Sequence, residues 1–115
     1  MAKARIGDSG RAAERALAKR LDGRQTLGSG GLRGDKGDIE IPGYLLEAKS
    51  TIADAYRLEF NDLVKISREA AQKGRRPAFS VLFLGPDEKP KRYGRWVLVQ
   101  EDEFQELVER KNADV

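Results

Sequence analysis

The stretch Gly37-Asp-Ile-Glu-Ile-Pro-Gly-Tyr-Leu-Leu-Glu-Ala-Lys49 decides how this chain folds. Apolar side chains alternate with polar ones over much of its two arms, which is the pattern of half-buried strands. Pro42 and Gly43 lie between the arms, and both residue types favour tight turns. The stretch therefore predicts a β-hairpin.

The turn sets which side chains of the hairpin lie opposite each other. If Pro42 and Gly43 are its central residues, Asp38 faces Glu47. A four-residue loop keeps this pairing, whereas a loop of odd length does not. Directly opposed side chains have Cβ atoms about 5 Å apart, and like charges so placed repel unless something lies between them. Lys49 points the same way as Glu47, because side chains two residues apart share a face. The hairpin thus predicts a divalent cation held by two carboxylates beside an ammonium group.

A simpler interpretation is an exposed hairpin face whose three charges are only solvated. Glu47 and Lys49, however, interrupt a strand whose other residues from 44 to 48 are apolar. Their face is therefore apolar enough to be partly covered, and charges are rarely buried without a partner or a metal. This favours the metal site.

The composition narrows the chemistry that such a site can use. The chain has no cysteine and no histidine, which excludes disulfides, thiolate zinc sites and histidine bases. Catalysis must then depend on carboxylates, Lys, Arg, Tyr, Ser or water bound to a metal. Oxygen ligands suit Mg²⁺, with Mn²⁺ as a substitute.

Length and hydropathy bound the organisation of the protein. With 115 residues, 39% of them apolar and 36% charged, the chain predicts one soluble domain over residues 1–115. No stretch approaches the roughly 20 apolar residues of a membrane span, and the N-terminus does not read as a signal peptide. We expect a cytoplasmic protein without a membrane partner. Its net charge of +3 is compatible with a polyanionic partner.

Periodicity and breakers predict helices and strands on both sides of the hairpin. We expect helices over residues 9 or 10 to 21, 61–73 and 101–111, and strands over 25–28, 78–84 and 95–100. Because Tyr56 fits the apolar arc of the second helix, that helix either begins earlier or follows an extended segment at 55–60. The order α-β-β-β-α-β-β-α predicts an α/β fold, with a mixed central sheet flanked by helices.

The first helix carries a candidate for the acidic site. Asp8 or Ser9 is its expected N-cap, and its inward stripe contains Leu17 and Leu21. Glu14 falls at the edge of this stripe, from which it can face the hairpin; alternatively it is a rim residue paired with Arg11.

Two connections are basic. Residues 29–37 form a glycine-rich loop whose Arg33 and Lys36 suit a phosphate, although a merely flexible surface loop fits the composition equally well. Residues 85–94 form a second long loop, which carries Lys89, Lys91 and Arg92.

These elements together resemble the PD-(D/E)XK nuclease superfamily. The likeness depends on Glu14 in the opening helix, the glycine-rich loop, Gly37-Asp38-Ile39 and Leu46-Glu47-Ala48-Lys49, followed by a helix that ends at Gly74. More closely, the chain is similar to archaeal-type Holliday junction resolvases and their phage and bacterial relatives. The resemblance implies a restriction-endonuclease-like fold.

The resemblance also implies roles for individual residues. Asp38, Glu47 and the main-chain carbonyl of Ala48 would bind the metal, with Glu14 completing the set directly or through water. Lys49 would orient or help deprotonate the attacking water and stabilise charge on the phosphate. Two further positions match functional residues of the family, namely Arg15 and Ser29. Ala48, the long glycine loop and the second basic loop depart from the family pattern and leave substrate choice open.

The expected activity is metal-dependent, structure-selective cleavage of DNA, most specifically resolution of four-way (Holliday) junctions in DNA recombination and repair. We expect a location at the nucleoid or in the cytoplasm of a phage-infected host. The alternatives are a restriction-like or repair nuclease on linear DNA, and a non-catalytic domain whose basic residues grip phosphates.

A homodimer is expected, because resolution needs two symmetric cuts and four apolar residues exceed the needs of a small core. These are Phe79, Phe83, Trp96 and Val97.

Overall fold

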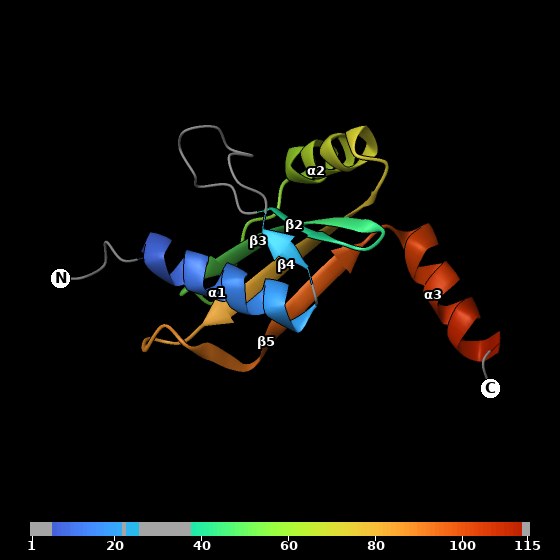
Figure 1. Cartoon of the computed structure of the whole chain (residues 1–115). Coiled ribbons are helices and arrows are strands. Elements are labelled where there is room, and N and C mark those ends of the chain that lie inside the picture. Colours follow the sequence, from blue (N-terminus) through green and yellow to red (C-terminus); the bar gives the residue numbers. More distant parts are fainter. Residues whose placement is uncertain (1–5, 22, 26–37, 114–115) are drawn as a thin grey trace.

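The computed structural model describes residues 6–21, 23–25 and 38–113. Its elements are α1 (Ile6–Arg20), β1 (Arg24–Gln25), β2 (Asp38–Ile41), β3 (Tyr44–Thr51), α2 (Phe60–Gln72), β4 (Arg76–Leu84), β5 (Pro90–Val99) and α3 (Glu101–Ala113). The predicted α/β class with a mixed sheet is confirmed (Figure 1). Ser29, Arg33 and Lys36 lie outside the described residues.

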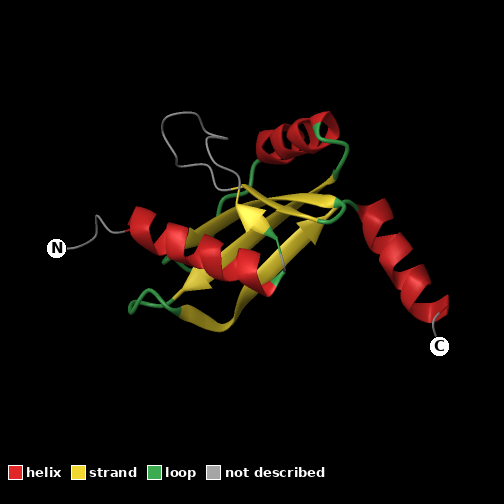
Figure 2. Ribbon diagram, in the orientation of Figure 1, coloured by secondary structure: helices red, strands yellow, loops and turns green. Residues whose placement is uncertain are grey.

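The five strands form one sheet in the order β1-β2-β3-β4-β5. Only β3 and β4 pair in parallel, and the other neighbours in the described sheet are antiparallel. A parallel pair needs a long crossover, and α2 supplies it. Helices α1 and α2 cover opposite faces of the sheet (Figure 2). Each face therefore has its own small apolar core.

The hairpin register is confirmed. Asp38 pairs with Glu47 and Ile41 with Tyr44, across a turn at residues 42 and 43. Gly43 has φ +86°, a conformation that side-chain-bearing residues rarely adopt. Successive side chains of β3 point to opposite faces of the sheet. Leu45 therefore packs with α2, and Leu46 packs with α1.

Helix α2 begins and ends at identifiable signals. The Asp62 carboxylate accepts a hydrogen bond of 3.0 Å from the N–H of Glu59, which fixes the start at Phe60. An earlier start at Tyr56 is therefore wrong. Gly74 has φ +66°, and the N–H of Arg75 donates to the carbonyl of Ala70 at 2.8 Å. This left-handed ending follows the Schellman pattern.

Helix α1 differs from the prediction at both ends. It begins at Ile6, so Asp8 and Ser9 lie inside its first turn instead of capping it. Acidic residues are favoured in a first helical turn too, because the N-terminal end of the helix dipole is positive. Leu21 follows the helix and is exposed, and Ala18 occupies the buried centre of the stripe instead.

The prediction of a long loop over residues 85–94 is wrong. The strand begins at Pro90, and the turn is closed by the N–H of Gly85 donating to the carbonyl of Lys89 at 2.8 Å. A register shift between Leu82 and Leu84 accommodates the irregular stretch near Gly94. A bulge of this kind interrupts the alternation of a strand, and the residues therefore resemble a loop in sequence.

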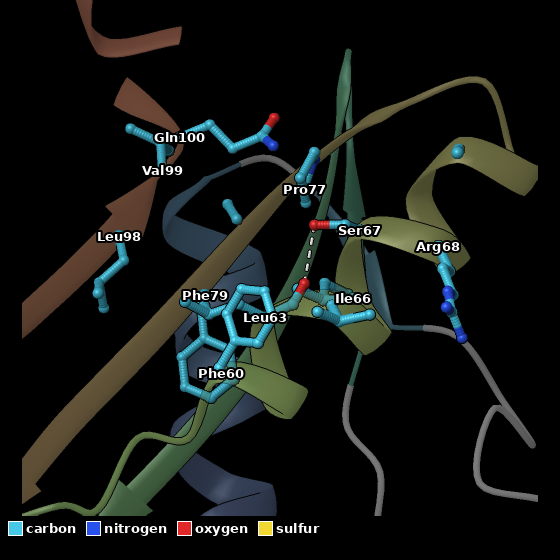
Figure 3. Close-up of a pocket in the computed structure, with 13 residues that line it drawn as sticks. Phe60, Leu63, Ile66, Ser67, Arg68, Pro77, Phe79, Leu98, Val99 and Gln100 are labelled. Carbon is cyan, nitrogen blue, oxygen red and sulfur yellow. Dashed lines mark hydrogen bonds between the residues drawn. The ribbon is translucent and has the colours of Figure 1, made fainter. Parts of the chain in front are cut away.

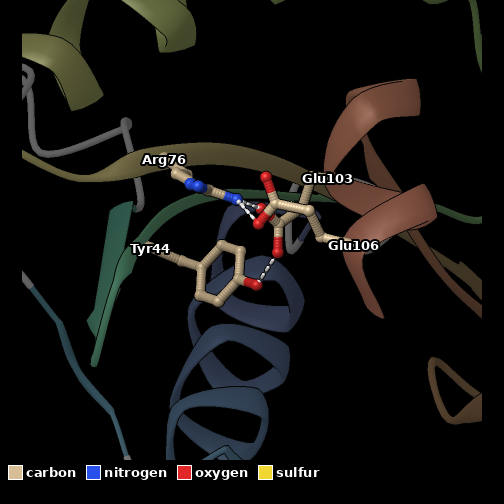
Figure 4. Close-up of polar contacts among 4 residues, drawn as sticks. All are labelled: Tyr44, Arg76, Glu103 and Glu106. Carbon is tan, nitrogen blue, oxygen red and sulfur yellow. Dashed lines mark hydrogen bonds and ion pairs between the residues drawn. The ribbon is translucent and has the colours of Figure 1, made fainter. Parts of the chain in front are cut away.

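Helix α3 is attached by its polar side (Figure 4). The Tyr44 hydroxyl donates to the buried carboxylate of Glu103, and Arg76 pairs with both Glu103 and Glu106. The helix projects from the end of the sheet (Figure 1). Its apolar side chains Phe104, Leu107 and Val108 are exposed, which reverses the usual orientation of an amphipathic helix.

A groove of about 550 Å³ lies between α2 and the end of β5 (Figure 3). It exists because α2 packs over β3 and β4. Apolar side chains from three elements line it, including Phe60, Leu63, Phe79 and Leu98. Among the described residues, no helix is long and apolar enough to cross a membrane.

We expect Glu103→Ala to release α3 while the two cores remain folded, because Tyr44 and Arg76 both lose a partner. Amide hydrogen exchange in residues 104–113 should accelerate on the order of tenfold, and exchange in β3 and β4 should not change. Glu109→Ala, at an exposed position of the same helix, is the matched control. Equal exchange in the two variants would contradict this anchoring.

Candidate metal centre

The hairpin brings two carboxylates into the protein interior. Asp38 and Glu47 lie opposite each other in β2 and β3, with only 2% and 5% of their surfaces exposed. Glu47 shares the α2 face with Leu45, because the two residues are two positions apart. Buried acidic groups are rare unless a partner or a metal compensates them. The predicted pairing is thus present, and α2 covers it.

A third carboxylate comes from α2. Asp38, Glu47 and the half-buried Glu69 each offer an oxygen, and the three oxygens lie within 4.8 Å of one another. The sequence analysis missed Glu69. It is adjacent to the buried Ala70 and three residues after the buried Ile66, so its place beside the inward face of the helix was the available signal. We name Asp38, Glu47 and Glu69 the carboxylate trio.

Without a bound cation, ionisation of all three carboxylates of the trio is unfavourable. Burial raises the pKa of Glu47, and the neighbouring charges of Asp38 and Glu69 raise it further, against the opposing effect of Lys49. A divalent cation would reverse this balance. All three ligands are hard oxygen donors, so the residues fit Mg²⁺ or Mn²⁺.

Lys49 lies beside the trio as predicted. Its Nζ is 3.2 Å from Oε2 of Glu47. Burial alone would lower the pKa of Lys49, but the attraction and hydrogen bond of Glu47 raise it, and the net direction is upward. The side chain is therefore an ammonium ion at neutral pH. It suits the stabilisation of negative charge better than the removal of a proton.

Glu14 lies elsewhere. It is half-buried on α1, which covers the opposite face, and it does not belong to the trio. It does line a cavity of about 170 Å³ together with Lys49 and Trp96. The role of Glu14 as a ligand, directly or through water, stays a prediction.

Two further predicted residues, Ala48 and Arg15, lie outside the trio. Ala48 lies between Glu47 and Lys49 in β3, its side chain packs toward α1, and the metal-binding role of its carbonyl stays a prediction. Arg15 is exposed on α1.

Three predicted DNA-binding cations lie in the turn between β4 and β5 or in the first residues of β5, namely Lys89, Lys91 and Arg92. Lys89 is exposed in the turn, and Lys91 forms an ion pair with Asp54. The guanidinium of Arg92 lies 4.9 Å from the ring centre of Tyr93.

Comparison with protein-family models, curated proteins and solved structures finds no match.

We expect Mg²⁺ or Mn²⁺ to raise the melting temperature, because a cation bound only by the folded trio stabilises it by about 2.7 kcal/mol at 100 times Kd. Asp38→Asn, Glu47→Gln and Glu69→Gln should each abolish most of this rise in a calorimetric or fluorescence melt. Glu109→Gln, at an exposed position on α3, should keep it.

The same rise should fade on acidification, because carboxylates must be ionised to bind the metal. The loss should begin above the usual glutamate range, since the pKa of Glu47 is raised. An identical Mg²⁺ response in wild type and Glu69→Gln would exclude Glu69 as a ligand.

Proposed function

We propose that this protein is a Mg²⁺-dependent endonuclease that hydrolyses phosphodiester bonds in DNA, with Mn²⁺ able to replace Mg²⁺. The observation that carries the proposal is the Asp38–Glu47 pair with Lys49 beside it on one face of the hairpin. Two buried carboxylates and an ammonium ion are what a phosphodiesterase needs when it has neither histidine nor cysteine.

The architecture agrees with a PD-(D/E)XK nuclease of the restriction-endonuclease-like type. An opening helix, a hairpin that carries the acidic residues, and a helix crossing over to a parallel strand follow one another in the expected way. In this proposal Glu69 supplies the third carboxylate, from α2. This support comes from arrangement and chemistry, since no sequence or structural relative matches.

Each residue near the trio has a distinct part. Asp38, Glu47 and Glu69 would hold the cation. Bound there, Mg²⁺ would lower the pKa of a water molecule and neutralise charge on the phosphate. Lys49 would place its ammonium group against the scissile phosphate, where negative charge grows during hydrolysis. Because β2 and β3 belong to the sheet, they hold these groups more rigidly than loops would.

The proposed substrate is branched DNA, with the four-way junction first. Arg15, Lys89, Lys91 and Arg92 would contact the phosphate backbone, together with Ser29, Arg33 and Lys36. Such contacts carry no base specificity. Linear DNA as substrate, or binding without cleavage, are the alternatives that the following experiment separates.

We expect wild-type protein to cleave labelled four-way junctions in Mg²⁺ and not in EDTA, and to cleave forks and linear duplex more slowly. Asp38→Asn, Glu47→Gln and Lys49→Ala should each slow cleavage by at least about 100-fold. Binding in EDTA should remain, because these groups act at one phosphate.

Lys19→Ala, at an exposed position on α1, is the control for Lys49→Ala. Full activity of Glu47→Gln would refute the assigned site. Faster cleavage of linear duplex than of junctions would keep the nuclease and reject the junction as its substrate.

The proposed enzyme is a homodimer, because resolving a junction takes two cuts related by a two-fold axis. Two of the four residues predicted to be surplus, Phe79 and Phe83, pack in the core beside α2, whereas Trp96 and Val97 are exposed. Two other apolar surfaces of the described residues are the outward stripe of α3 and the groove beside α2. We propose that the stripe of each copy packs into the groove of the other.

We expect light scattering to give about twice the monomer mass of 12.8 kDa. The double variant Phe104→Ser and Leu107→Ser should be monomeric, because it removes the apolar stripe. Tyr93→Ser, which removes an exposed aromatic from β5, should remain dimeric. A monomeric wild type that still resolves junctions would contradict the dimer and leave the nuclease proposal intact.

A further inference from the structure

Two aromatic side chains of β5 lie open to solvent where the strand bulges. Tyr93 is 78% exposed and Trp96 is 60% exposed. Both line one shallow hollow with Arg92 and Lys91. Large exposed aromatic rings among cations differ from an apolar protein interface, because the surrounding charges remain hydrated. They match the surfaces on which unpaired nucleic-acid bases stack.

The backbone holds these rings in place. Tyr93 has φ +63°, an uncommon conformation for a bulky residue. The next residue is a buried glycine, where a Cβ atom would lie 2.7 Å from the carbonyl oxygen of Phe83. The indole N–H of Trp96 donates to the carbonyl of Tyr93 at 2.8 Å. The one polar group of the indole is therefore satisfied, and the faces of the ring are left for stacking.

Cations outnumber carboxylates around the rings, since Asp54, which pairs with Lys91, is the one acidic residue among those that line the hollow. The Arg92 guanidinium lies 4.9 Å from the centre of the Tyr93 ring. Arg95 is exposed and lines the cavity that Trp96 shares with Lys49. A nucleic-acid strand presents alternating anionic phosphates and flat bases. The cations and the rings match these two features.

The sheet places Trp96 on the same face as Lys49, two strands away. Lys49 pairs with Val81 in β4, and Val81 pairs with Trp96 in β5. Directly paired residues share a face, and adjacent strands are about 4.8 Å apart, so the Cα atoms of Lys49 and Trp96 are roughly 10 Å apart. This distance corresponds to about three nucleotide steps at the roughly 3.4 Å rise per strand of duplex DNA, and to fewer steps in an extended unpaired strand. A strand whose phosphate lies at Lys49 can therefore reach Trp96 with a base a few positions away.

We propose that Tyr93 and Trp96 form a stacking platform for the bases of an unpaired DNA strand. The proposal rests on the proposed function for its partner, and it assigns the platform to the strand that leaves the cleavage site at a branch point. Bases in an intact duplex are stacked on each other and do not offer their faces. The platform therefore selects unpaired DNA.

Trp96 is the only tryptophan of the chain, so its fluorescence reports on the platform directly. The experiment is a titration of the whole protein, in EDTA, with a twelve-residue oligothymidylate. The comparison ligands are an abasic strand of equal length and a duplex of equal length. We expect strong quenching by the oligothymidylate alone. Equal quenching by the abasic strand would overturn the proposal, because phosphate contacts would then suffice.

Substitutions give the second measurement. Trp96→Ala and Tyr93→Ala should each weaken oligothymidylate binding roughly 5- to 100-fold by fluorescence anisotropy, while Trp96→Phe should keep most of the affinity. Gln72→Ala, at an exposed position at the end of α2 and outside every proposed site, is the control and should bind like wild type. Unchanged affinity in Trp96→Ala, or equal losses for duplex and single strand, would overturn the platform.

Working in EDTA separates this proposal from the nuclease. A protein that stacks oligothymidylate but never cleaves DNA in Mg²⁺ would support the platform and refute the enzyme. A protein that cleaves but shows no loss in Trp96→Ala would do the reverse.

Discussion

The main constraint on this structure is the burial of Asp38 opposite Glu47, which the rest of the fold has to accommodate. Two like charges within one hairpin are unfavourable in an apolar interior, and Glu69 adds a third from above. Lys49 compensates them only in part, since the pKa of Glu47 is still raised. The surrounding packing must therefore hold the carboxylates together, and the two apolar cores on either side of the sheet do so.

Much of the fold could be predicted because its signals are local. The Pro42-Gly43 turn determined the register of the hairpin, and Gly74 marked the end of α2. Predictions failed where tertiary structure decides. The bulge near Gly94 hides the first half of β5, and α1 begins at Ile6, before the predicted caps Asp8 and Ser9.

The site was predictable only as far as one hairpin determines it. Asp38, Glu47 and Lys49 lie within twelve residues and share a strand pair. The alternation of side chains along the two strands therefore predicts that all three lie on one face. Glu69 joins them only because α2 crosses over the sheet, which no local pattern specifies. Glu14 shows the same limit in reverse: its place at the edge of the helical stripe was foreseeable, but the face of the sheet that α1 covers was not.

The parallel pairing of β3 with β4 also has a consequence for the order of folding. The hairpin can form within microseconds from neighbouring residues, whereas β4 must find β3 across the whole of α2. Until that crossover closes, the chain holds two acidic groups and not three. If the trio binds a divalent ion as proposed, high-affinity capture of that ion would be a late event. The ion would add little to the early hairpin and would slow unfolding once α2 has docked.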